Sequence, residues 1–176
     1  MERVKDPDEM QQRDERFTRL VEMYQTPLLR MCCLYLRDAA LAEDAVQETF
    51  VKVYRSMDSF RGDCSEKTWV MRIAMNTCHD LRRSGWFRLM DRRYTPDMLP
   101  EAGANCTAED DTLITAVMQL PIKLREVVLL YYYQGMTTTE IADALGLSQS
   151  SVSGRLKRAR DKLRDALERR EPLAGE

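Results

Sequence analysis

The chain has 176 residues, of which 44% are hydrophobic and 32% charged, with a formal net charge of −2. This length suits one ordinary domain or two small ones, and seven glycines and six prolines leave little material for a turn-rich β fold. No apolar run approaches the roughly 20 residues that a bilayer demands, and the first residues lack a secretory signal, so we expect a cytoplasmic protein without membrane insertion.

Helical periodicity dominates the first half of the chain. We expect residues 1–14 to form a flexible N-terminus and residues 15–86 to form a first helical domain. Apolar residues recur on one face in three segments: 15–37, 41–56 and 66–84. Pro27 predicts a kink in the first of these helices. The clearest stripe, in the second segment, consists of Ala42, Ala45, Val46, Thr49, Phe50 and Val53. Three helices with such stripes can share one small core.

The periodicity is lost between residues 85 and 107, where Pro96, Pro100 and Gly103 lie among polar residues. We therefore expect a linker over 87–108, a second helical domain over 109–170 and a frayed tail over 171–176. The predicted fold class is all-α: two small helical domains joined by a flexible linker. The C-terminal domain is expected to be a helix-turn-helix.

The helix-turn-helix prediction rests on the segment TTTEIADALGLSQSSVSGRLKRARDKLR. Pro121 can begin the preceding helix and Gly135 can end it. Thr137 and Glu140 have capping-box spacing, and Gly146 can supply a left-handed residue between two short helices. Ser148 is then a natural N-cap for the second helix.

The exposed side of that second helix carries short polar residues first and basic residues later. This order allows close approach to base edges in a major groove, followed by phosphate contacts. The candidate duplex-binding residues are Gln149, Ser150, Ser151, Ser153, Gly154, Arg155, Lys157 and Arg158. An ordinary helical hairpin with a solvated, charged last helix is the alternative, and the local excess of basic residues favours DNA.

Charge is unevenly distributed, although its sum is small. Residues 155–170 hold eight basic and three acidic side chains, whereas 97–111 holds acidic ones alone. The five cysteines are expected to be reduced thiols that fill packing gaps, because an odd number without an export signal argues against a disulfide framework. Cys78 adjoins His79, the one histidine, but no C-x-x-C partner exists, so we expect no metal and no cofactor.

Three segments in order resemble bacterial RNA polymerase sigma factors of the extracytoplasmic-function (ECF) type. They are AEDAVQETFVKVYRSMDSFRG, TWVMRIAMNTCHDLRR and LPIKLREVVLLYYYQGMTTTEIADALGLSQSSVSGRLKRARDKL, and the resemblance covers roughly residues 15–168. It implies a protein that binds core RNA polymerase and directs initiation at promoters in a stress or envelope response. The domains would correspond to sigma regions 2 and 4, and the chain would not be an enzyme.

The resemblance also implies roles for particular residues. Asp44, Gln47 and Glu48 would bind the polymerase, and they lie at helical spacing in one polar patch. The melted −10 strand would be held by Phe60, Arg72, Asn76, Arg82 and Arg83, through stacking, base-edge hydrogen bonds and phosphate contacts. Phe60 could instead anchor its loop to the domain, and Trp69 is expected in the core. The acidic linker would pass through the polymerase interior.

One departure concerns the −35 duplex. Many family members carry a basic residue at Ser153 and a bulky one at Lys157. Ser153 and Gly154 would reach less far into the groove, so the family's −35 sequence cannot be carried over. Family members are usually held inactive by an anti-sigma factor, often anchored in the membrane, and we expect such a partner here.

Two other functions fit parts of the sequence. A conventional helix-turn-helix regulator would dimerise or sense a signal through its first domain and bind a palindromic duplex without polymerase. An interaction protein would use its first domain chiefly to hold a partner. Neither reading accounts for all three segments together.

Overall fold

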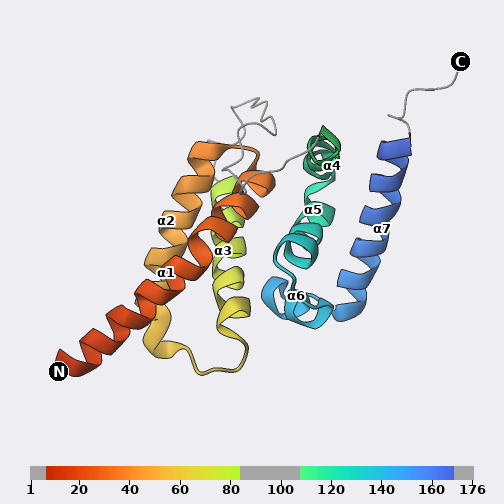
Figure 1. Cartoon of the computed structure of the whole chain (residues 1–176). Helices are drawn as coiled ribbons and strands as arrows, with labels where there is room; N and C mark the ends of the chain where they lie inside the picture. Colours follow the sequence, from red (N-terminus) through yellow and green to blue (C-terminus); the bar gives the residue numbers. More distant parts are fainter. Residues whose placement is uncertain (1–6, 84–107, 169–176) are drawn as a thin grey trace, which may run out of the picture.

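The computed structural model describes residues 7–83 and 108–168, and these parts of the chain contain helices and no strand. Figure 1 shows two helical groups side by side: α1, α2 and α3 in red to yellow-green, and α4 to α7 in green to blue. The all-α prediction is confirmed. No helix in the described ranges is both long and apolar enough to cross a bilayer.

The first group begins with a helix longer than expected. α1 spans Pro7–Leu36 and runs without interruption through Pro27. Residues 7–14 were expected to be flexible, and this was wrong. Asp8 and Glu9 lie in the first turn, where carboxylates favour the helix dipole. Arg13 also anchors the helix to α2 by donating to the Tyr54 carbonyl oxygen at 2.6 Å.

The other helices of the first group follow the predicted stripes. α2 spans Ala39–Ser56, a short 3-10 turn η1 spans Met57–Ser59, and α3 spans Glu66–Arg83. Asp38 caps α2 by accepting from the Leu41 backbone N–H at 2.9 Å. Every residue of the predicted α2 stripe is buried.

The second group has short helices joined by tight turns. It contains α4 (Ala108–Gln119), α5 (Ile122–Val128), a π-helical turn η4 (Leu129–Tyr133), α6 (Thr138–Leu145) and α7 (Gln149–Glu168). Gly146 adopts the predicted left-handed conformation, with a φ of 64°, and Gly135 is also left-handed, with a φ of 62°. The predicted linker 87–108 lies outside the described residues except for position 108, which is helical, and the tail 171–176 also lies outside them.

The capping box at the start of α6 is present. Thr137 Oγ1 accepts from the Glu140 backbone N–H at 3.2 Å, and the Glu140 carboxylate accepts from the Thr137 backbone N–H at 2.8 Å. The hydrogen bonds that the Glu140 carboxylate accepts from the Thr137 backbone N–H and from the Thr137 hydroxyl lower the pKa of Glu140. The start of α6 is therefore fixed by two side chains, twelve and nine positions before Gln149, the first residue of α7, which is the expected recognition helix of the helix-turn-helix.

We predict that Thr137→Ala lowers the free energy of unfolding by about 1 kcal/mol, because α6 loses its N-cap. Urea titration at pH 7 measures the loss, and Thr139→Ala, an exposed neighbour on the same helix, is the control. Glu140→Gln tests the charge. Since the folded-state pKa of Glu140 is depressed, its contribution is present above the unfolded pKa of about 4.3 and is lost as the pH falls through the folded value. If the free energy of unfolding of Glu140→Gln differs from that of wild type by the same amount well below this pH range as at pH 7, the assignment is contradicted.

The two groups share a packed interface. Buried residues from both belong to one continuous apolar cluster. Arg125, 6% exposed, crosses the interface from α5: it donates to the Tyr35 carbonyl oxygen of α1 at 2.9 Å and to the Leu120 carbonyl oxygen at 3.0 Å. Gln134 Nε2 donates to the Pro27 carbonyl oxygen at 3.1 Å. The two groups of described helices are thus packed against each other in one structural unit.

Candidate nucleic-acid interface

The N-terminal half of α7 presents an open polar surface. Ser148 caps the helix by accepting from the Ser151 backbone N–H at 3.2 Å. Val152, Leu156 and Ala159 fix the opposite side in the core. The predicted duplex-binding residues that are exposed are Gln149, Ser150, Ser151, Ser153, Lys157 and Arg158. These side chains share one solvent-facing side of a capped helix, which is the geometry that major-groove reading requires.

Two predicted residues on α7 differ from this pattern. Gly154 and Arg155 are half-buried. Arg155 Nη1 lies 2.5 Å from Glu126 Oε1, and its side chain is 17% exposed. Arg155 is therefore ion-paired with Glu126 of α5, whereas Lys157 and Arg158 are exposed to solvent.

The polar face of α2 is exposed as predicted. Asp44, Gln47 and Glu48 all face solvent, and Glu48 pairs with Lys52 at 2.9 Å. Beside Gln47, an open hollow of about 560 Å³ lies along the contact between α1 and α2, and it is lined mostly by apolar side chains such as Phe17, Val46 and Phe50. A polar patch next to an apolar hollow can take up an amphipathic partner helix.

Phe60 lies at a second hollow, of about 540 Å³, between the start of α1 and the loop after η1. Its ring packs against that of Trp69 at 4.8 Å between centroids, tilted by 33°, and the Arg16 guanidinium lies 5.4 Å from the ring centre. Trp69 is 9% exposed, as expected of a core residue. Phe60 thus anchors its loop and also lines a polar hollow.

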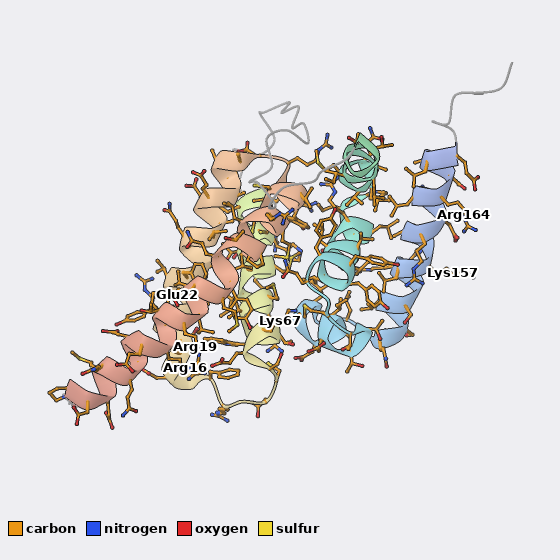
Figure 2. All side chains as sticks on the ribbon, viewed as in Figure 1. Arg16, Arg19, Glu22, Lys67, Lys157 and Arg164 are labelled. Carbon is orange, nitrogen blue, oxygen red and sulfur yellow. The ribbon has the colours of Figure 1, made fainter. Side chains whose placement is uncertain are left out.

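Arginines of α1 were missed as members of this site. Arg13 and Arg16 line the hollow with Phe60. Arg16 and Arg19, labelled in Figure 2, reach Glu66 at the start of α3 at 2.7 and 3.4 Å. The sequence motif Asp6-Pro7-Asp8-Glu9 is an N-terminal helix signal that could have extended the predicted helix 15–37 back to include Arg13.

The predicted −10 residues of α3 lie in different surroundings. Asn76 and Arg83 are exposed and Arg82 is half-buried. Arg72 instead forms an ion pair with Asp143 of α6. The structure therefore leaves part of the predicted surface open and covers the part around Arg72.

Family models match both groups of helices. The sigma-70 region 2 model matches residues 20–88, and the sigma-70 region 4 model matches residues 110–163. The chain belongs to the sigma-70 family. Its ECF type follows from its relatives, and like other sigma factors it is an initiation factor and not an enzyme.

Sigma factors of several bacteria resemble this one over most of their length. The RNA polymerase sigma-H factor of Pseudomonas aeruginosa is 30% identical over 176 residues, covering 92% of this chain and 91% of that protein. The ECF RNA polymerase sigma factor SigW of Bacillus subtilis is 27% identical, covering 86% of this chain and 88% of that protein. Both domains are therefore matched in one alignment.

Solved sigma factor structures have a similar arrangement. CnrH, solved in complex with the cytosolic domain of CnrY, is 28% identical, with a TM-score of 0.70 over 90% of this chain and 91% of that one. The sigma factor RpoE of Bartonella quintana, in complex with the anti-sigma factor NepR, has a TM-score of 0.74 over 88% of this chain and 98% of that one. At 21% identity the second comparison supports the fold alone.

Proposed function

We propose that this sigma factor binds core RNA polymerase through its first domain and binds promoter DNA through both domains. The observation that carries this division is the pair of separate polar surfaces, on α2 and on α7, in domains that match sigma regions 2 and 4. Weak contacts at two sites become selective when they are joined in one assembly. This initiation of transcription is proposed to take place in the cytoplasm, where RNA polymerase binds DNA.

Run-off transcription tests the proposal. Purified core polymerase is supplied with a pool of promoter fragments from the source genome, with and without this chain. Discrete transcripts that depend on the chain support the proposal and reveal its promoters. An absence of transcripts, together with no co-elution with core enzyme, would favour the stand-alone regulator.

The α2 surface formed by Asp44, Gln47 and Glu48 is proposed to bind the polymerase. We predict that Glu48→Lys weakens binding to core polymerase by at least about tenfold, because it places a like charge beside Lys52 and reverses the charge of the patch. Binding to −35 duplex should be unchanged, since α7 lies in the other domain. Equal loss of both activities would contradict the assignment of roles.

A matched charge reversal serves as the control. Glu22 is exposed on α1, and Glu22→Lys makes the same change in net charge away from the α2 patch. Co-elution of core polymerase with each variant, at two salt concentrations, separates a local contact from a general effect of charge. Glu22→Lys is expected to co-elute as wild type does.

The −10 strand is proposed to bind along Phe60, Asn76 and the exposed end of α3. The hollow beside Phe60 is large enough for an unstacked base, and its arginine lining suits a phosphate backbone. Asn76 is exposed and carries both a donor and an acceptor for a base edge. Base capture of this kind favours the opened strand without nucleotide hydrolysis.

An anti-sigma factor is the proposed regulator, in a stress or envelope response. The similar protein CnrH was solved in complex with the cytosolic domain of CnrY, which supports a protein partner for this chain. The partner would cover Asp44, Gln47 and Glu48 or enter between the domains. A pull-down from unstressed cells, with membranes solubilised, should recover it; recovery of polymerase alone would count against it.

A further inference from the structure

The starts of α6 and α7 lie next to each other, and a side-chain hydrogen bond joins them. Thr138 is the first residue of α6, and Gln149 is the first residue of α7. Gln149 Nε2 donates to Thr138 Oγ1 at 3.0 Å. Figure 1 shows α6 beside the lower end of α7. Gln149 is exposed, but its side-chain amide is therefore held against α6 before any DNA is bound.

This hydrogen bond leaves most of the Gln149 amide available to a ligand. A glutamine amide carries two N–H donors and a carbonyl oxygen that accepts. Thr138 takes one N–H, and among the described residues the amide makes no other hydrogen bond. One donor and one acceptor on the same amide thus remain available at the start of the recognition helix.

The serines around Gln149 have hydrogen-bond partners within the helix cap. Ser148 Oγ lies 3.1 Å from Ser150 Oγ and 2.8 Å from Ser151 Oγ. In residues 149–154, Gln149 is the one polar side chain longer than serine. The side chain that reaches furthest from the first turns of α7 is therefore also the one that carries both a donor and an acceptor on a planar group.

A donor beside an acceptor matches a particular base edge in the major groove. Adenine presents the N7 acceptor next to the N6 amino donor, whereas guanine presents two acceptors, N7 and O6. A glutamine amide can form two hydrogen bonds with adenine, but with guanine its carbonyl oxygen would face another acceptor. A bidentate contact of this kind favours the matching base pair by about tenfold or more.

We propose that Gln149 determines the base preference of α7 by binding one adenine of the −35 duplex, with Thr138 as the positioning residue that holds its amide. An amide that is already held loses less side-chain entropy when DNA binds. Lys157, labelled in Figure 2, and Arg158 are exposed about two turns further along α7, where basic side chains contact phosphates without sequence preference. This inference rests on the proposed binding of α7 to the −35 duplex.

The first experiment measures binding of the polymerase holoenzyme to a promoter found by run-off transcription, in which each −35 base pair is replaced in turn by the other three. With wild type, replacing one particular A·T pair should weaken binding about tenfold. Gln149→Ala should reduce the preference at that pair to within about twofold and keep the preferences at the other pairs. Lys157→Ala is the control on the same helix, and it should weaken binding to all sequences alike.

The second experiment changes the preferred base. Gln149→Glu replaces the amide with a carboxylate, which only accepts hydrogen bonds and suits the N4 amino group of cytosine. The preference at the position of the A·T pair should therefore change to C·G. A general loss of helix structure would weaken binding to every sequence and would not produce a new preference.

The third experiment tests Thr138. Thr138→Val removes the hydroxyl and should lower the preference for the A·T pair about threefold, because the amide is no longer held. Thr138→Ser keeps a hydroxyl and should behave as wild type does. Thr139→Val, at an exposed neighbouring position, is the matched control. Circular dichroism confirms that each variant is folded, and an unchanged preference in Thr138→Val would overturn the positioning role.

These measurements separate this proposal from the proposed function. If holoenzyme with wild type neither initiates at discrete promoters nor distinguishes any −35 base pair, the proposed function fails. If wild type distinguishes −35 base pairs but Gln149→Ala keeps the whole pattern, the role of Gln149 alone is overturned. A loss of preference at a pair other than A·T would overturn the assignment of adenine.

Discussion

Arg125→Met is expected to lower the free energy of unfolding by about 3 kcal/mol, the largest effect of any polar substitution in the interface. The guanidinium donates to the carbonyl oxygens of Tyr35, Met118 and Leu120. A hydrophobic replacement can compensate a buried ion pair, but it cannot satisfy buried backbone carbonyls, which keep their desolvation cost. Burial lowers the pKa of Arg125 to about 10, so the side chain is still charged at neutral pH.

Thermal and urea unfolding measure this prediction. For a chain of this size, a loss of about 3 kcal/mol lowers Tm by on the order of 10 °C. Lys123→Met, at an exposed position on the same helix, removes a positive charge without touching the interface and should change stability little. An Arg125→Met variant as stable as the Lys123→Met variant would show that the three carbonyl contacts contribute nothing net.

Leu156→Ala should cost about 3 kcal/mol as well and should abolish binding to −35 duplex. Leu156 is 2% exposed in the core beneath α7, and a Leu-to-Ala change there leaves a cavity as well as losing apolar contact. The recognition helix would lose one of its three buried anchors. The patch assigned to the polymerase lies on α2 in the other domain, so binding to core polymerase should persist.

The comparison variant for Leu156→Ala is Lys162→Ala, an exposed position on the same helix. Urea unfolding should separate the two by about 2 kcal/mol or more. Gel-shift assays with the −35 duplex then show whether the loss of anchoring reaches the DNA surface. If Leu156→Ala binds the duplex as well as wild type at a temperature well below its unfolding temperature, anchoring of α7 by Leu156 is not needed for DNA binding, and the prediction is wrong.

The helix-turn-helix could be predicted because its signals are local. The capping box at Thr137, the left-handed Gly146 and the Ser148 cap each act over three or four residues, so the sequence shows both partners together. The exposed patch on α2 was predictable for the same reason, since helical spacing alone places Asp44, Gln47 and Glu48 on one face.

The docking of the domains could not be predicted in this way. Arg72 and Asp143 are 71 residues apart, and Arg125 reaches Tyr35 across 90 residues. Periodicity says that a position is polar, but it does not say which distant group will satisfy it. Arg125 and Glu126 are both buried in α5, and buried charged residues usually have partners in neighbouring elements.

The glycine in the recognition helix has a consequence for protein engineering. Gly154 lies inside the 20-residue helix α7, where glycine costs up to about 1 kcal/mol relative to alanine. A methyl group at this position would meet no atom within 4 Å. A design that optimises thermal stability alone would therefore choose Gly154→Ala among its first substitutions, and it would add bulk on the side of the helix assigned to the major groove. Stabilised versions of this protein should be selected for promoter choice as well as for melting temperature.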